Sequence, residues 1–259
     1  MSGLVAWWDP PASGPDNMAA DELLAAESLR LDQVVVRVYG WSEPAVSLGG
    51  FQRLADARAR PEVAHLPLVR RPSGGGAILH GSDLTYAAAV PRGHAWGGDP
   101  QRLYDVFHEA LAELLRERGV AARRHPGRGR EAGDEERFLC FDRRARGDLV
   151  VDVAGTVDGH KILGSAQRRL HAAVLQHGSL LLTQPTSDGK AIGHPGLLDL
   201  HPATGLGPLR LLVAAWLERV ARQAAAAVDW RDESFLAAAE PTLAAAAERF
   251  RSPEWLARR

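Results

Sequence analysis

A run of three glycines, Gly74–Gly76, lies within the segment RRPSGGGAILHGSDLTY (Arg70–Tyr86). Successive glycines between strands are costly in conformational entropy, so they indicate a backbone path that other residues cannot follow. Without β-carbons, such a loop can lie against a ligand and offer amide groups to a carbonyl or phosphate oxygen. The segment has neither the G-K-[ST] of a Walker loop nor the spacing of GxGxxG. It predicts backbone contact with a ligand, with a flexible hairpin bend as the alternative.

The second segment, GHKILGSAQRR (Gly159–Arg169), contains Lys161, and the only other lysine in the chain is Lys190. The remaining basic residues, apart from histidine, are arginines, so a bias against lysine makes a retained lysine informative. Alternation along a strand places Lys161, Leu163 and Ser165 on one face. On an inward face the ammonium could stabilise an acyl carbonyl or a phosphate. On an outward face it would lie in water, as most lysines do.

Cys140 is the only cysteine, and it follows the Gly- and Arg-rich stretch Arg123–Arg137, which we expect to form a loop. A single buried cysteine is often a small apolar core residue. Positive charge beside it would instead stabilise a thiolate nucleophile. Both interpretations of Cys140 stay open on the residues alone.

The chain has ten histidines, but none of them forms an HxxH, HExxH or Cys/His cluster. We therefore predict no metal site. His80 and His177 are the histidines near the two segments above, and we expect each to anchor a loop by hydrogen bonds rather than to act as a base.

The composition is that of a soluble globular protein, with 46% hydrophobic and 24% charged residues and a formal net charge of −1. That charge gives no reason to expect nucleic acid or an anionic membrane as a partner. No apolar run approaches the roughly 18 residues of a membrane span, and the N-terminus does not look like a signal peptide. With one cysteine, no internal disulfide is possible, so we expect a cytoplasmic protein.

The hydrophobic periodicity predicts one α+β domain over residues 1–259, whose part from about 208 to 259 is helical. Helices are expected at Asp16–Leu31, capped by Asp16 or Asn17, and at Asp99–Gly119. A short helix is expected within Gln52–Arg60. Strands are expected at Val34–Tyr39, Ala45–Gly50 and Leu66–Arg71, as a pair AILH and LTYAAAV joined by HGSD, and in LVVDVAG, HKILGSAQRR and AAVLQHGSLLL.

Four blocks, in this order, resemble the lipoate-protein ligase and octanoyltransferase family of the biotin/lipoate ligase superfamily. They are NMAADELL (Asn17–Leu24), PAVSLGGFQ (Pro44–Gln52), RRPSGGGAILHGSDLTY, and GHKILGSAQRR with LQHGSLLL (Leu175–Leu182). The resemblance covers roughly residues 17–182. It implies an α+β catalytic domain of the biotin/lipoate ligase type, with a mixed sheet flanked by helices.

The resemblance also implies roles for particular residues. Lys161 would bind the acyl carbonyl and, in a ligase, the phosphate of an acyl-adenylate. The acyl- or substrate-binding residues would be Arg70, Ser73, Gly74, Gly75, Gly76, Ala77, His80, Gly164, Ser165 and Ala166.

Two branches of the family differ in how they activate the acyl group. Octanoyltransferases take octanoate from acyl carrier protein through a cysteine thioester and need no cofactor, whereas ligases use ATP and Mg²⁺. The Cys-Phe pair at Cys140 resembles the nucleophile of one transferase group. The interval from Cys140 to Lys161 is longer than in that group by an insert near Ala154–Val157, and the loop P-S-G-G-G-A is closer to the ligases.

We therefore expect Cys140 and Lys161 to be catalytic in octanoyl transfer to a lipoyl-domain lysine. The acceptors implied by the resemblance are glycine cleavage H protein or dehydrogenase E2 subunits. The alternatives are an ATP-dependent lipoate-protein ligase, an octanoyl amidotransferase between lipoyl-domain proteins, and a non-catalytic acyl-binding module.

Overall fold

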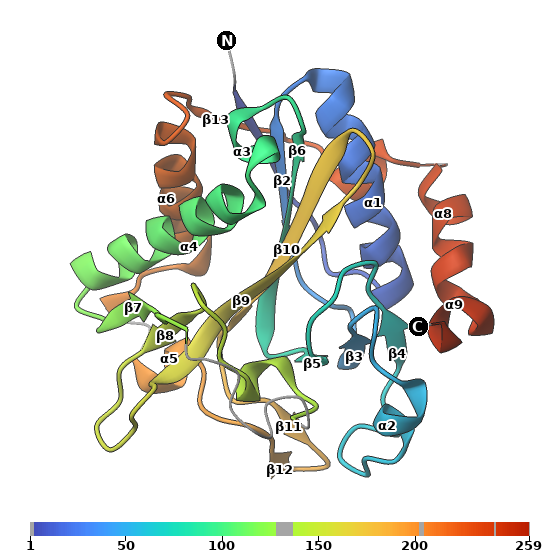
Figure 1. Cartoon of the computed structure of the whole chain (residues 1–259), viewed down its shortest axis with the longest axis vertical. Helices are drawn as coiled ribbons and strands as arrows, with labels where there is room; N and C mark the ends of the chain where they lie inside the picture. Colours follow the sequence, from blue (N-terminus) through green and yellow to red (C-terminus); the bar gives the residue numbers. More distant parts are fainter. Residues whose placement is uncertain (1–2, 128–136, 202–204, 241, 259) are drawn as a thin grey trace.

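A computed structural model of the protein shows an eight-stranded sheet with the strand order β13-β1-β2-β6-β10-β9-β8-β7 (Figure 1). The structure describes residues 3–127, 137–201, 205–240 and 242–258. Strands β13, β1 and β2 run parallel, and the neighbours from β2 onward are antiparallel, so the sheet is mixed as predicted. The strands are β1 (Leu4–Trp8), β2 (Val34–Tyr39), β6 (Asp83–Pro91), β7 (Ala122–Arg124), β8 (Leu149–Val151), β9 (His160–Arg169), β10 (Ala173–Leu181) and β13 (Val228–Trp230).

Helices cover both faces of this sheet (Figure 1). Helices α4 (Pro100–Glu117) and α6 (Leu209–Arg222) pack on one face, where Phe107 stacks on Tyr86 with ring centroids 5.0 Å apart. Helices α1 (Gly14–Leu31), α8 (Thr242–Arg251) and α9 (Pro253–Ala257) cover the other. The short helices are α2 (Leu54–Arg58), α3 (Ala95–Gly98), α5 (Leu197–Leu200) and α7 (Phe235–Ala238), and a 3₁₀ turn, η1, spans Cys140–Asp142.

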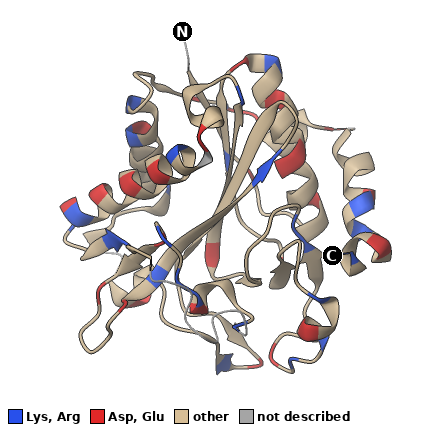
Figure 2. Ribbon diagram, viewed as in Figure 1, with Lys and Arg blue, Asp and Glu red and all other residues tan. Residues whose placement is uncertain are grey.

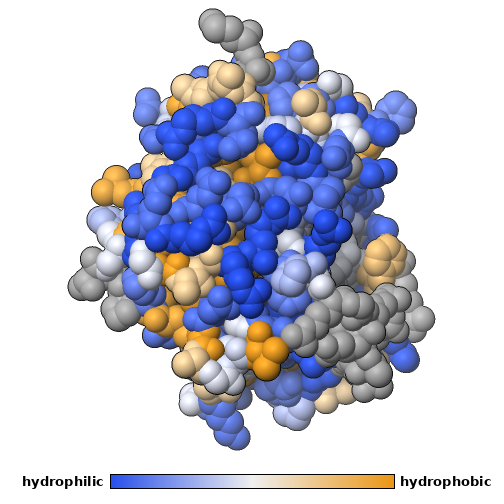
Figure 3. Space-filling view, turned by 60° about the vertical axis from the view of Figure 1, so that its left-hand side comes forward, coloured by the Kyte–Doolittle hydropathy of each residue, from blue (hydrophilic) through white to orange (hydrophobic). Residues whose placement is uncertain are grey.

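The side of the molecule that carries α4 and α6 is largely hydrophilic on its surface (Figure 3). Helix α4 therefore behaves as the predicted amphipathic helix, with its apolar stripe turned to the sheet. Within the described residues, no helix is long and apolar enough to cross a bilayer.

A second, three-stranded sheet carries the glycine loop. Its order is β4-β3-β5, and its strands are β4 (Leu68–Arg70), β3 (Ala45–Leu48) and β5 (Ile78–His80). A separate two-stranded hairpin is formed by β11 (Thr186–Ser187) and β12 (Lys190–Ala191).

The expected hairpin between AILH and LTYAAAV is not formed. Strand β5 pairs with β3 in the small sheet, whereas β6 pairs with β2 and β10 in the large one. The turn between them is tightened by Asp83, which accepts hydrogen bonds from the Gly81 amide at 3.2 Å and binds His80 Nδ1 at 2.9 Å. Gly81 has φ of +117°, which lets the chain pass from one sheet into the other.

The predicted start of the first helix was wrong. Helix α1 begins at Gly14 and is capped by Ser13, whose side chain accepts from the Asp16 amide. Asn17 lies inside the first turn and donates its side-chain amide to the carbonyls of Ala12 and Gly40, so it ties the helix to the loop before it.

Other predicted bounds also need correction. The missed strands include β1 near the N-terminus and β13 within the C-terminal part, which pair with each other in parallel, and the short hairpin strands β11 and β12. Arg123 and Arg124 belong to strand β7 rather than to a loop, and residues 128–136 of that predicted loop lie outside the described residues. The single domain over residues 1–259 stays a prediction.

Candidate active site

The turn that carries Cys140 is joined directly to the end of the glycine loop. The Cys140 amide donates to the Ala77 carbonyl at 2.7 Å, and the Ala77 amide donates to the Phe138 carbonyl at 2.9 Å. A β-carbon added at Gly76 would lie 3.0 Å from both the amide nitrogen and the Cα of Cys140. Since these are backbone atoms, a larger residue at Gly76 would push the loop away from the cysteine.

The side chain of Lys161 reaches the same cysteine. Its Nζ lies 3.5 Å from Cys140 Sγ and 3.3 Å from the Cys140 carbonyl oxygen. Asp148 holds the ammonium from the other side, with Nζ to Oδ2 at 2.9 Å. Burial would lower the pKa of Lys161, but Asp148 and Cys140 outweigh burial and raise that pKa above its ordinary value. The group therefore stays a cation at neutral pH, close to the sulfur.

A β-bulge sets the direction in which Lys161 points. Leu163 pairs with Leu149 and Lys161 pairs with Val150, so Ile162 is one extra residue on β9. An extra residue shifts the alternation of the strand locally. The expectation that Lys161, Leu163 and Ser165 share one face was wrong for this reason.

Ser165 accordingly points elsewhere than Lys161. Its hydroxyl contacts the Tyr86 hydroxyl and His108 Nε2, both at 2.8 Å. The stem of Lys161 instead lies over Gly164, where an added β-carbon would come within 2.4 Å of the Lys161 Cε. Glycine at this position leaves the space that the lysine stem occupies.

The insert near Ala154–Val157 does not separate Cys140 from Lys161. It lies in the connection between β8, which ends at Val151, and β9, which begins at His160. The longer interval in the sequence is therefore accommodated in a connection away from the two side chains.

Arg71 holds the glycine loop in place. Its guanidinium donates to the Gly74 carbonyl at 3.1 Å and to the Gly76 carbonyl at 2.7 Å. The same group donates to the carbonyl and hydroxyl oxygens of Ser47, both at 2.7 Å. Burial lowers the pKa of Arg71 to about 10, so the side chain is still charged at neutral pH. The sequence motif contains both arginines, and only the structure distinguishes their roles.

Arg70, which was expected to line the acyl site, points the other way. It donates to the carbonyls of Gly49, Gln52 and Leu256, each at 2.8 Å. Arg70 therefore fastens the small sheet to the C-terminal helices, and its neighbour Arg71 takes the place predicted for it.

Three buried polar side chains from separate elements form a chain behind the loop. Ser73 Oγ hydrogen-bonds His177 Nε2, and His177 Nδ1 lies 3.1 Å from Asp21 Oδ2. Asp21 is fixed in turn by Arg37 and by the Tyr39 hydroxyl, both at 2.9 Å. This chain anchors the start of the glycine loop to α1 and β10.

His80 is anchored in a comparable way. Its Nε2 lies 2.7 Å from the Ser47 hydroxyl and its ring stacks on Trp41 with centroids 3.7 Å apart. Burial lowers the pKa of His80 despite the adjacent Asp83, which favours the neutral ring. Both histidines thus anchor loops, as expected from the sequence.

A narrow cavity of about 40 Å³ opens beside the cysteine, and we call it the acyl cavity because the family resemblance predicts acyl binding here. Met18, Tyr39 and Trp41 are among the residues that line it. Six of the predicted site residues line it, namely Gly75, His80, Cys140, Gly164, Ser165 and Ala166. The other predicted residues, Arg70 and Lys161 among them, do not line it. The Ser73 hydroxyl turns toward it and bonds His177 in its wall, Gly74 lines a cleft on the other side of the loop, and Gly76 and Ala77 contact the cysteine turn.

Gln52 links a second predicted block to this site. Its side-chain oxygen accepts from the Gly49 amide and its nitrogen donates to the Phe138 carbonyl, both at 3.0 Å. The block PAVSLGGFQ thus supports the segment that ends in the candidate nucleophile.

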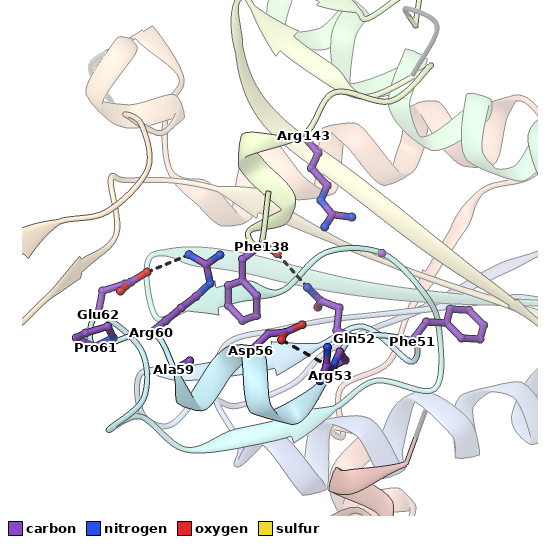
Figure 4. Close-up of a pocket in the computed structure, with 11 residues that line it drawn as sticks. Phe51, Gln52, Arg53, Asp56, Ala59, Arg60, Pro61, Glu62, Phe138 and Arg143 are labelled. Atoms are coloured by element: carbon purple, nitrogen blue, oxygen red, sulfur yellow. Dashed lines mark hydrogen bonds and ion pairs between the residues drawn. The ribbon is translucent and has the colours of Figure 1, made fainter. Parts of the chain in front are cut away.

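A groove of about 1080 Å³ runs over α2, and it borders the glycine loop at Gly75 (Figure 4). Charges of both signs line it, with Arg53 4.0 Å from Asp56 and Arg60 3.5 Å from Glu62. We call it the mixed-charge groove. Within the described residues, no group of three or more His, Cys, Asp or Glu side chains is placed to hold a metal ion.

Comparison with known proteins gives a family match over most of this fold. The model of the lipoyl protein ligase A/B catalytic domain matches residues 13–193. The octanoyltransferase LipM of Kyrpidia tusciae is 36% identical over 176 residues, which are 64% of this chain and 61% of that protein. The LipM of Moorella thermoacetica is 38% identical over 174 residues, 64% of this chain and 60% of that protein. The chain thus spans about three-fifths of the length of these curated relatives.

Solved structures agree in fold. A putative lipoate protein ligase from T. acidophilum with bound lipoic acid superposes with a TM-score of 0.66 at 18% identity, covering 99% of both chains. A lipoate-protein ligase A bound with ATP gives 0.66 at 19% identity, covering 98% of both chains. At this identity the likeness establishes the fold, and the predicted α+β architecture is confirmed.

Proposed function

Because the chain belongs to the lipoyl protein ligase A/B catalytic domain family, we propose that it transfers an octanoyl group in protein lipoylation. The donor is octanoyl acyl carrier protein, the intermediate is a thioester on Cys140, and the acceptor is a lysine of a lipoyl-domain protein. Glycine cleavage H protein and dehydrogenase E2 subunits are acceptors of this kind. The resemblance inferred from the sequence motifs is confirmed at the level of the family.

The single observation that carries the proposal is the cation beside the sulfur. The Lys161 ammonium is buried, paired with Asp148 at 2.9 Å, and 3.5 Å from Cys140 Sγ. A fixed positive charge at that distance can stabilise the negative charge that the sulfur carries when it attacks a carbonyl and when it leaves. The LipM relatives, which are octanoyltransferases by name, support the same assignment.

In the first step the Cys140 thiolate attacks the thioester carbonyl of the donor. The new bond joins Sγ to the carbonyl carbon, the bond from that carbon to the carrier sulfur breaks, and the carrier leaves as a thiol after taking up a proton. The negative charge on the carbonyl oxygen needs donors during the attack. Lys161 can supply one, and the amides of Gly75 and Gly76, which donate to no acceptor among the described residues, can supply others.

In the second step the neutral amine of the acceptor lysine attacks the acyl-enzyme. The carbon–nitrogen bond forms, the bond to Cys140 Sγ breaks, and the proton lost by the amine passes to solvent. Lys161 stabilises the departing thiolate as it stabilised the attacking one. The net reaction exchanges a thioester for an amide and requires no cofactor.

The test is intact mass spectrometry of the enzyme after mixing with octanoyl carrier protein. An octanoyl adduct is expected on the native chain and is expected to disappear when a lipoyl-domain acceptor is added. Cys140→Ala should carry no adduct, and an adduct that persists in this variant would overturn the assignment of the nucleophile.

Three further measurements separate the alternatives. ATP consumption that depends on lipoate and survives Cys140→Ala would instead establish an ATP- and Mg²⁺-dependent ligase, in which Lys161 and the loop hold the acyl-adenylate. An adduct formed only from an octanoylated lipoyl domain would establish amidotransfer. Tight binding of the acyl group without turnover on any acceptor would establish a binding module.

A further inference from the structure

A cleft of about 340 Å³ lies on the outer side of the glycine loop, away from the acyl cavity. Ser73 and Gly74 form one wall, and the arginines Arg168, Arg169 and Arg258 contribute to the rest. Among the described residues, no aspartate or glutamate lines it. We call it the basic cleft, and the blue end of β9 in Figure 2 marks two of its arginines.

The positive charge of the basic cleft is not neutralised within the described part of the chain. Arg168 donates to the Pro72 carbonyl at 3.2 Å, and the Arg258 guanidinium lies 4.0 Å from the ring centroid of Trp255. Neither of them, nor Arg169, forms an ion pair with a described carboxylate. Like charges gathered in a concave site raise the local potential and attract anions.

Because the basic residues of the cleft are arginines, the kind of anion that it binds can be specified further. Its planar guanidinium binds carboxylate and phosphate oxygens in pairs, and it is more weakly hydrated than a lysine ammonium. A partner that fits the basic cleft therefore presents carboxylates, a phosphate or both.

The glycine loop lies between the basic cleft and the acyl cavity, and Arg71 lines both. Ser73 and Gly74 line the basic cleft, and Gly75, the next residue, lines the acyl cavity. At the rim stands Phe51, with 83% of its surface exposed. An exposed aromatic ring beside arginines is the composition of energetically important positions in protein interfaces.

We propose that the basic cleft docks the acyl carrier protein that donates the octanoyl group. Resting on the function proposed above, this inference assigns the arginines to acidic side chains of the carrier and to the phosphate of its prosthetic arm, and Phe51 to its apolar surface. The acceptor fits this cleft less well, because it must bring a lysine amine whose charge the arginines would repel. The mixed-charge groove would repel a lysine less, because Asp56 and Glu62 lie there among the arginines Arg53, Arg60 and Arg143.

The test compares two charge-reversal variants of the full chain that change the net charge equally. Arg169→Glu with Arg258→Glu alters the basic cleft and leaves Arg168, which supports Pro72, in place. Arg102→Glu with Arg222→Glu is the matched control, at exposed positions of α4 and α6 on the far face of the sheet. For each variant, kcat/KM is measured with octanoyl carrier protein and with octanoyl-pantetheine, which lacks the protein and the phosphate. The Kd for labelled carrier protein, with and without its prosthetic arm, is measured by fluorescence anisotropy.

Reversal in the basic cleft is expected to raise the Kd for carrier protein about tenfold or more. It should also lower kcat/KM about tenfold more with the carrier than with octanoyl-pantetheine, while the control variant shows no such difference. If the Kd rises less for carrier protein without its prosthetic arm than for carrier protein with it, part of the binding is due to the phosphate of the arm. The inference would be overturned by an unchanged Kd for carrier protein, or by an equal loss of kcat/KM with both thioesters. It would also be overturned if the variant bound the lipoyl-domain acceptor, rather than the carrier protein, more weakly. If the native enzyme forms no octanoyl adduct but the Kd responds as expected, the proposed function fails and the docking site stands.

Discussion

Among the described residues, side chains such as Lys161 have carboxylate partners on one side of the glycine loop, whereas the arginines on the other side lack them. On the side of the acyl cavity, Lys161 is paired with Asp148, and His80 and His177 are each held by a carboxylate. On the outer side, the arginines of the basic cleft have no carboxylate partner among the described residues. A chain of four residues, Ser73–Gly76, divides the two environments.

The difference follows from hydration, because water stabilises the exposed charges but not the buried ones. A buried charge without a partner is strongly destabilising, so the inner pairs are required for folding and also fix the geometry before a substrate arrives. An exposed charge is stabilised by water and gains little from a salt bridge. Arginines can therefore be left unpaired outside and remain available to a partner. This difference fits the roles proposed for the two sides, reaction on the inner side and recognition of the carrier protein on the outer side.

The strongest test of the inner side is Lys161→Met, which keeps an unbranched side chain as far as Cε and removes the charged Nζ. We expect the rate of Cys140 acylation to fall about 10²- to 10³-fold, because the thiolate and the oxyanion lose their fixed cation. Rapid-quench intact mass spectrometry with octanoyl-pantetheine as the donor measures the rate of Cys140 acylation. Lys190→Met, at the exposed lysine of β12, is the matched control and should keep the native rate.

Removing Lys161 also leaves Asp148 buried without its partner, so loss of folding must be separated from loss of chemistry. The double variant Lys161→Met with Asp148→Asn removes both charges and is expected to melt closer to the native protein than the single variant. A folded double variant that acylates at the native rate would remove Lys161 from the mechanism.

A smaller but more specific effect is expected for Asp148→Asn. Asp148 makes the largest contribution that raises the pKa of Lys161, so without it burial lowers that pKa. We expect acylation at neutral pH to slow about tenfold or more. In the variant the rate should also begin to fall at a lower alkaline pH than in the native enzyme, where Asp148 keeps the pKa of Lys161 raised. Single-turnover rates between about pH 6 and pH 10 measure this, and identical alkaline profiles would show that Asp148 does not control the lysine.

Ser73→Ala tests the anchor between the two sides. Loss of the hydrogen bond to His177 should loosen the start of the glycine loop, and we expect kcat to fall about tenfold with little change in the KM for octanoyl-pantetheine. Ser187→Ala is the matched control, because Ser187 also contacts a histidine, His65 at 3.2 Å, but lies in the β11–β12 hairpin. An equal loss of kcat in both variants would point to general destabilisation rather than to the loop.

The loop and the lysine were predicted from local motifs with a physical reason for their residue types, whereas Cys140 was predicted as the nucleophile only through the family resemblance. The sequence did not predict Asp148, which approaches Lys161 through the pairing of β8 with β9. Such a partner depends on strand register, and here a bulge at Ile162 changes both the register and the face. No residue type in β9 indicates that bulge.

Arg70 shows a similar limit of local reasoning. Arg70 ends β4 and Arg71 follows it, and alternation alone sends the two side chains to opposite sides. Which arginine turns away from the glycine loop depends on the C-terminal helix α9, whose Leu256 carbonyl accepts from Arg70. That contact joins residues 186 positions apart, and nothing in the helical C-terminal sequence pointed to it.

The smallest expected effect is a change of kcat/KM with ionic strength, and it should differ between the two sides of the glycine loop. Exposed charges are screened over about 8 Å at physiological salt, whereas buried pairs are screened much less. Raising the salt concentration from about 0.01 M to 0.15 M should therefore lower kcat/KM for octanoyl carrier protein severalfold, mainly through KM. The rate with octanoyl-pantetheine should change by less than about twofold, because its chemistry depends on the buried Lys161 and Asp148. Steady-state assays at matched pH measure both. If kcat/KM depended equally on salt for the two thioesters, the salt-sensitive charges would lie in the acyl cavity itself. The assignment of reaction and recognition to opposite sides of the glycine loop would then be wrong.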